Sequence, residues 1–161
     1  MNDRDVRAAI DTAIEHVLAE RPQLDFGAHE RSTAFRLAVH MEPLFPGWNV
    51  DCEYDRDGDD LGKHLAGIRE CSDKKRTDAI IPDIIVHHRR QQGHDHNLLV
   101  IELKKNSECD PCDQRKLELL TSPDGHFHYQ LGLYINIAGG QFARTWYENG
   151  RQQDNPTPVG R

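Results

Sequence analysis

The sequence predicts an α/β fold, a mixed central β-sheet flanked by helices, and three observations support this prediction. Apolar residues recur at helical spacing through most of residues 3–42. Two apolar runs at residues 79–88 and 97–104 are joined by a polar turn, which is typical of a β-hairpin. A helical pattern at residues 113–120 then separates these runs from further strand-like segments, as in a β-α-β unit.

Two helices are expected first. Residues 3–21 form an apolar stripe and end before Pro22, which cannot continue a helix. Residues 29–42 form a second stripe that ends before Pro43, because the residue before a proline disfavours helical geometry. The residues expected to face the core are Val6, Ile10, Ala13, Ile14, Val17 and Leu18 in the first helix, and Ala34, Leu37, Ala38 and Met41 in the second.

The remaining elements are mostly strands. Residues 48–54 read as a strand, and residues 55–78 are polar and turn-rich, which predicts a long loop of the kind that often carries function. The strands at 79–88 and 97–104 follow. After the helix at 113–120, with Leu117 and Leu120 facing inward, residues 129–138 and 141–148 are expected to pair as a hairpin around Gly139 and Gly140.

Length and composition indicate one domain. The chain has 161 residues, of which 37% are hydrophobic and 29% are charged, and we expect a single domain at 1–150 followed by a polar tail at 151–161. No segment is long and apolar enough to span a membrane, and the first residues lack a signal-peptide pattern, so the expected location is the cytoplasm. The net charge of −7 argues against a strongly basic, non-specific nucleic-acid binder.

Acidic residues occur in two adjacent apolar runs. The first run, Ile80-Ile81-Pro82-Asp83-Ile84-Ile85-Val86, contains Asp83, and the second ends in Glu102-Leu103-Lys104. Side chains alternate between the faces of a strand, so Glu102 and Lys104 share a face, where Asp83 of the neighbouring strand could meet them. Buried carboxylates are costly unless they are paired, and a divalent cation would provide a partner.

The pattern Pro82-Asp83 followed by Glu102-Leu103-Lys104 resembles the signature of the PD-(D/E)XK nuclease superfamily, and the order of elements from about Glu30 to Glu148 is similar. The resemblance implies a restriction-endonuclease-like fold and a metal-dependent nuclease, a phosphodiester hydrolase with DNA as the expected substrate. Asp83 and Glu102 would bind Mg²⁺ or Mn²⁺, and Lys104 would position or activate the attacking water. The alternative is that these charges are a solvated strand end.

Further candidates lie outside this motif. Glu30 lies on the buried stripe of the second helix, where the resemblance implies a third metal ligand, and the alternative is a favourable helix-dipole interaction. Glu53 is either a ligand or a solvated strand residue. Lys105 faces away from Lys104 and would contact phosphate or solvent. Gln130 is a candidate substrate contact; the Gln130–Tyr134 pattern occurs on a helix in one branch of the superfamily, whereas it reads here as a strand.

The cysteines raise a separate question. In a cytosolic protein Cys52, Cys71, Cys109 and Cys112 are expected to be reduced. Cys109 and Cys112 form a CxxC pair, half of a zinc site, which His126 and His128 could complete. Their spacing matches no standard zinc finger.

Two functional hypotheses remain from the sequence. The first is the nuclease, an enzyme that binds nucleic acid and no membrane and could act as a homodimer or with a partner subunit. The second is a catalytically inactive nuclease-like binding or regulatory module. The acidic balance and the lack of a recognisable DNA-reading motif leave this alternative open.

Overall fold

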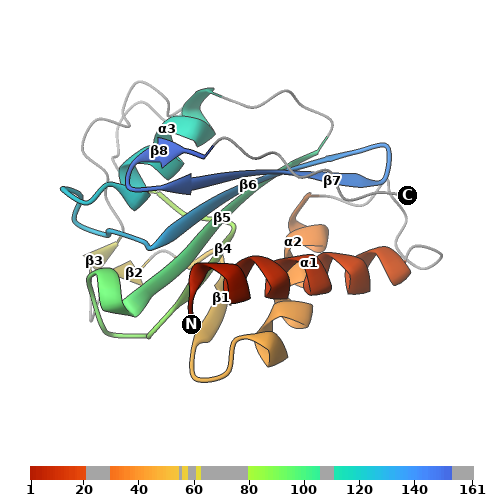
Figure 1. Cartoon of the computed structure of the whole chain (residues 1–161), viewed down its shortest axis with the longest axis horizontal. Coiled ribbons are helices and arrows are strands. Elements are labelled where there is room, and N and C mark those ends of the chain that lie inside the picture. Colours follow the sequence, from red (N-terminus) through yellow and green to blue (C-terminus); the bar gives the residue numbers. More distant parts are fainter. Residues whose placement is uncertain (21–29, 55, 58–60, 63–79, 106–110, 154–161) are drawn as a thin grey trace.

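The computed structural model describes residues 1–20, 30–54, 56–57, 61–62, 80–105 and 111–153. Its main element is a six-stranded sheet of strand order β1-β4-β5-β6-β7-β8 (Figure 1). The pair β5-β6 is parallel and the other neighbours are antiparallel, so the predicted α/β fold with a mixed sheet is confirmed. The finer assignment to a restriction-endonuclease-like fold stays a prediction.

Two helices cover one face of the sheet. The helix α1 (Asp3–Ala19) begins at Asn2, whose side chain accepts a hydrogen bond from the backbone N–H of Asp5. The helix α2 (Glu30–Met41) is followed by a 3-10 turn, η1 (Glu42–Leu44). Every residue predicted to face the core is buried except Leu18, which is partly buried and packs against the same core. Apolar residues of both helices pack on the β-sheet to form the larger core.

The first strands form an antiparallel region. Strand β1 (Asn49–Cys52) pairs with β4 (Ile84–His87), and β4 pairs with β5 (Asn97–Lys105). A 3-10 turn, η3 (His94–His96), lies in the β4–β5 connection. Strand β4 begins later than predicted, because Pro82 has no N–H to donate to a ladder. The short strands β2 (Arg56–Asp57) and β3 (Leu61–Gly62) pair within the predicted 55–78 loop, most of which lies outside the described residues.

The helix α3 (Pro111–Thr121) connects β5 to the parallel strand β6 (Leu131–Ala138) and covers the opposite face of the sheet (Figure 1). It packs on a second, smaller core that includes Leu117 and Leu120 from the helix and Val100 from β5. Strand β7 (Gln141–Glu148) completes the predicted hairpin, and Gly139 and Gly140 both have positive φ in its turn. The site described below lies on the α3 side of β5.

The predicted boundary at residue 150 needs correction. Strand β8 (Arg151–Gln152) pairs with Tyr147 and Glu148 and adds a sixth strand to the sheet. The connecting residues Asn149 and Gly150 have φ of 52° and 74°, and this Asn-Gly pair is the preferred sequence for a tight hairpin turn. The rest of the predicted tail, from residue 154, lies outside the described residues. None of the described helices is long and apolar enough to cross a membrane.

Candidate functional site

The sheet register brings Asp83 and Glu102 to the same face. Ile84 pairs with Ile101 in the antiparallel β4-β5 ladder, so Asp83, directly before β4, lies opposite Glu102. The backbone N–H of Leu103 donates to Oδ2 of Asp83 at 2.8 Å, which fixes this carboxylate against β5. The neighbouring Val100 on the same face of β5 belongs to the smaller core beneath α3. Both acids therefore lie on the α3 side of the sheet.

Lys104 completes the predicted trio and links it to two helices. Its Nζ lies 3.4 Å from Oδ2 of Asp113 in α3 and 3.6 Å from Oε1 of Glu30 at the first turn of α2. Glu30 thus contacts Lys104, and its negative charge also contributes to raising the pKa of Asp83. The structure brings Asp83, Glu102, Lys104 and Glu30 together, while their roles in metal binding and catalysis stay predictions.

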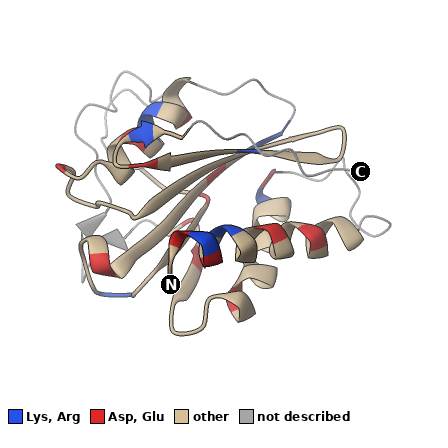
Figure 2. Ribbon diagram, viewed as in Figure 1, with Lys and Arg blue, Asp and Glu red and all other residues tan. Residues whose placement is uncertain are grey.

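The helix α3 adds two charged residues that the sequence analysis missed, Asp113 and Lys116. Nζ of Lys116 lies 2.9 Å from Oε2 of Glu102 and 3.4 Å from Oδ1 of Asp113. A signal was present in the sequence, because Asp113 precedes the buried Leu117 by four residues and so shares its face of the helix. Figure 2 shows acidic and basic residues side by side on α3. We call Glu30, Asp83, Glu102, Lys104, Asp113 and Lys116 the charged cluster.

Negative charge predominates in the charged cluster, which contains four carboxylates and two ammonium groups. Burial raises the pKa of Glu102 to about 8 and outweighs the opposing effect of Lys116. Burial likewise raises the pKa of Asp83, and the charge of Glu30 adds to this effect. Oε1 of Glu102 is buried and accepts no hydrogen bond from the described residues. The cluster therefore favours an additional proton or cation.

Both lysines stay charged. Burial opposes the charge of Lys104, but the carboxylates of Asp113 and Glu30 outweigh it and raise the pKa of the ammonium. Burial also opposes the charge of Lys116, and Glu102 and Asp113 raise its pKa in the same way. A lysine whose pKa is raised does not accept a proton near neutral pH. Either ammonium can therefore stabilise an anion or orient a water, and neither can serve as a general base.

The donor set can be tested for a divalent cation. No group of three or more His, Cys, Asp and Glu side chains within the described ranges is arranged to hold a metal ion. Mg²⁺, however, commonly binds through one or two carboxylates and keeps several waters. Asp83 and Glu102 provide such a pair, and Oε1 of Glu102 has no hydrogen-bond partner among the described residues. These two residues fit a hard, partly hydrated cation, with Glu30 nearby.

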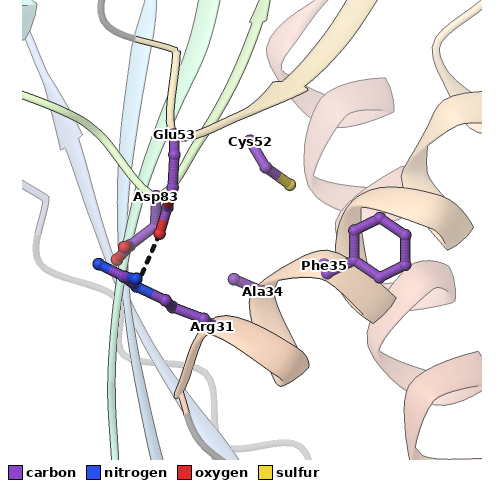
Figure 3. A pocket seen from close by; sticks show the side chains of 6 residues that line it. All are labelled: Arg31, Ala34, Phe35, Cys52, Glu53 and Asp83. Carbon is purple, nitrogen blue, oxygen red and sulfur yellow. Dashed lines mark ion pairs between the residues drawn. The ribbon is translucent and has the colours of Figure 1, made fainter.

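A pocket of about 230 Å³ adjoins the charged cluster (Figure 3). Asp83 belongs to its lining, as do the predicted candidate Glu53 and its neighbour Arg31, whose Nε lies 2.8 Å from Oε1 of Glu53. The other lining residues are Ala34, Phe35 and Cys52. Glu53 is therefore paired with Arg31 at the pocket. Among the described residues it forms no ion pair with either lysine of the cluster.

Two predicted contact residues lie away from the cluster. Gln130 precedes β6 and its side chain donates to the carbonyl of His94 at 2.9 Å. Tyr134 is the residue of β6 that pairs with Glu102, so Gln130 lies four positions, about 13 Å, along the sheet from this pairing. Lys105 follows Lys104 in β5 and by strand alternation faces the α1–α2 side. Neither position supports a direct role beside Glu102.

The cysteine prediction also needs correction. Cys112 is disulfide-bonded, so it is neither reduced nor available as a thiolate ligand for zinc. Its position in the first turn of α3 makes such a bond a covalent attachment for the helix end. Cys109 lies outside the described residues. Cys52 is a free cysteine, and burial together with the nearby carboxylates of Asp51, Glu53 and Asp83 raises the pKa of its thiol to about 11.

The sequence matches no protein-family model, and comparison with curated proteins likewise finds no match. The superfamily resemblance of Pro82-Asp83 and Glu102-Leu103-Lys104 therefore stays a prediction.

Proposed function

We propose that the protein is a metal-dependent nuclease that hydrolyses phosphodiester bonds, with DNA as the expected substrate. The observation that supports this most directly is the convergence of Asp83, Glu102 and Lys104 on one face of the sheet, where the buried Oε1 of Glu102 accepts no hydrogen bond from the described residues. A phosphodiester is an anion, and its hydrolysis needs cations beside the phosphate and an oriented water.

Each residue has a distinct task in this proposal. Asp83 and Glu102 would hold Mg²⁺ or Mn²⁺, and Glu30 would support them from α2. The bound cation supplies charge neutralisation at the phosphate and a more acidic water. Lys104, held between Glu30 and Asp113, would donate hydrogen bonds to a phosphate oxygen or to the attacking water. Lys116 would hold Glu102 in place through Oε2 and leave Oε1 for the cation.

A cleavage panel tests the proposal. The protein would be incubated with single-stranded, double-stranded and branched DNA and with RNA while Mg²⁺ or Mn²⁺ is titrated. We expect cleavage of at least one substrate that chelation abolishes. Asp83→Asn should lose both cleavage and metal affinity, because it removes a charge while keeping an oxygen that can accept from Leu103. The absence of metal-dependent cleavage across the whole panel would contradict the nuclease proposal.

The second candidate is an inactive nuclease-like binding or regulatory module, and the contact between Lys116 and Glu102 favours it. This 2.9 Å ion pair gives the most buried carboxylate of the cluster a cation from the protein itself. A cluster neutralised internally would stabilise the docking of α3 without any metal. Metal titration followed by calorimetry separates the candidates, because a module of this kind should show no binding that depends on Asp83 and Glu102.

A further inference from the structure

The pocket beside Asp83 has two chemically different sides (Figure 3). Phe35, Ala34 and Cys52 form an apolar side, and Arg31, Glu53 and Asp83 form a charged side. The ring of Phe35 is largely exposed, with 59% of the residue's surface accessible to solvent. An exposed aromatic ring beside a pocket is available for stacking with a planar ligand.

We propose that this pocket binds one unstacked base of a single-stranded nucleic acid, with the ring of Phe35 as its stacking surface. The inference rests on the proposed function in one respect, namely that the substrate is a nucleic acid. It adds a preference for single strands or for frayed and unpaired segments, because a base within a duplex cannot leave its stack without an energetic cost.

The size of the pocket agrees with this ligand. At about 230 Å³ it is smaller than the roughly 300 Å³ that marks the lower end of sites for drug-sized ligands. It therefore suits a single ring system better than a complete oligonucleotide. Ala34 and Cys52 have small side chains, so the apolar side beside Phe35 stays open to a flat ligand.

The charged side suits the polar edge and backbone of a nucleotide. Carboxylates such as Glu53 accept hydrogen bonds from the exocyclic amino groups of bases. Arg31 is 83% exposed in its side chain and carries a guanidinium that can bind phosphate bidentately. Its present partner Glu53 is half-exposed, so exchange of this surface ion pair for a phosphate contact costs little.

Asp83 connects the pocket to the proposed chemistry. It lines the pocket and also belongs to the charged cluster, where Oδ2 accepts from the N–H of Leu103. A base held against Phe35 would therefore bring its own backbone beside the residues proposed to act on phosphate. A pocket remote from the cluster could not position the scissile bond in this way.

Fluorescence anisotropy with a labelled single-stranded oligonucleotide tests the inference. Measurements in EDTA record binding without cleavage, and duplex of the same sequence serves as the comparison ligand. Phe35→Ala should weaken binding of the single strand about tenfold or more, because stacking of one base on an aromatic side chain changes the affinity by about this factor. Phe35→Tyr should retain most of the affinity. Val39→Ala is the matched control, since Val39 is exposed on the same helix one turn later and does not line the pocket.

The outcomes are separable from those of the cleavage panel. Equal single-strand binding by the Phe35→Ala and Val39→Ala variants would overturn the inference, as would the absence of single-strand binding by the intact protein. A Phe35→Ala variant that changes self-association in sedimentation without changing oligonucleotide binding would instead assign the ring to an interface between copies. Loss of binding in Phe35→Ala without metal-dependent cleavage by the intact protein would support the pocket and refute only the nuclease activity.

Discussion

The ammonium of Lys116 lies 2.9 Å from Oε2 of Glu102 and so joins α3 to the central strand β5. The other carboxylate oxygen, Oε1, is buried and accepts no hydrogen bond from the described residues. Within the described part of the chain, one oxygen of this carboxylate is therefore paired and the other is not. This asymmetry leads to predictions about stability, pH dependence and metal binding that need no assumption about the substrate.

The first prediction concerns pH. The pKa of Glu102 rises from 4.5 to about 8 on folding, so the folded state binds more protons than the unfolded state between these values. The contribution of this group to stability is complete below pH 4.5 and is lost as pH rises through about 8. The Glu102→Gln variant should lack this component of the pH dependence, which is on the order of a few kcal/mol. Chemical denaturation across pH 4 to 9 measures it.

Asp95→Asn is the control for this experiment, because Asp95 is exposed and lies in η3 away from the charged cluster. It should preserve the pH dependence of the intact protein. If the free energy of unfolding changed equally with pH in Glu102→Gln and in the intact protein, Glu102 would not titrate in this range. Mg²⁺ bound to the ionised carboxylate should stabilise the intact protein more as pH rises through the same range.

The second prediction concerns the ion pair itself. At pH 9, where Glu102 is ionised, Lys116→Met removes the cation from two buried carboxylates and should lower the free energy of unfolding by about 3 kcal/mol or more, because breaking a buried pair leaves an uncompensated charge. The double variant Lys116→Met/Glu102→Gln should recover part of this loss, because glutamine carries no charge. Urea denaturation of the four proteins in the cycle gives the coupling energy. A coupling near zero would mean that the 2.9 Å contact has no net energetic effect.

The third prediction concerns the contact between α3 and the sheet. Gly132 of β6 has no room for a side chain, since an added Cβ would lie 3.0 Å from Cγ2 of Thr121 and 3.2 Å from Cβ of Tyr147. Gly132→Ala should therefore lower stability by about 1 to 3 kcal/mol. Thr121→Ser removes the methyl group at the closest contact and keeps the hydroxyl that donates to Leu117. The double variant should recover stability relative to Gly132→Ala in thermal denaturation, and failure to do so would place the strain elsewhere.

Local patterns in the sequence predicted the fold and part of the site. Alternation along a strand places Glu102 and Lys104 on one face, and the apolar run that contains Asp83 and the run that ends at Glu102 indicated adjacent strands. The contribution of Lys116 depends on how α3 docks against β5, which no local spacing determines. The strand β8 was missed although Asn149 and Gly150 carry a hairpin signal, because only two residues follow the turn in the ladder.

The disulfide of Cys112 was missed for a different reason. Cysteine pairing follows from three-dimensional proximity and redox environment, and the sequence provided only the count and spacing. The late start of β4 shows the opposite case. Pro82 could have predicted the start of β4, because a residue without an N–H cannot donate to the ladder. The apolar pattern around it nevertheless favoured a longer strand.

The last prediction separates the two lysines in the proposed chemistry. Both lysines contact Asp113. Lys104 also contacts Glu30, which supports the proposed metal site, whereas Lys116 contacts Glu102, one of the two carboxylates proposed to hold the cation. Lys104→Ala should therefore abolish cleavage while largely preserving metal affinity, because this lysine acts on water and phosphate. Lys116→Ala should lower metal affinity first, since Glu102 loses the contact that holds it in place. Cleavage rates and calorimetric metal titrations on both variants measure the difference.

The comparison requires a substrate that the intact protein cuts and a saturating metal concentration for each variant. At saturation Lys116→Ala should recover cleavage if its role is to hold Glu102, and Lys104→Ala should remain inactive. Lys104→Arg keeps a positive charge and should restore some of the rate if charge alone matters at this position. Equal cleavage by the intact protein and Lys104→Ala would remove Lys104 from the mechanism. Loss of cleavage in Lys116→Ala that no metal concentration restores would instead place Lys116 at the phosphate.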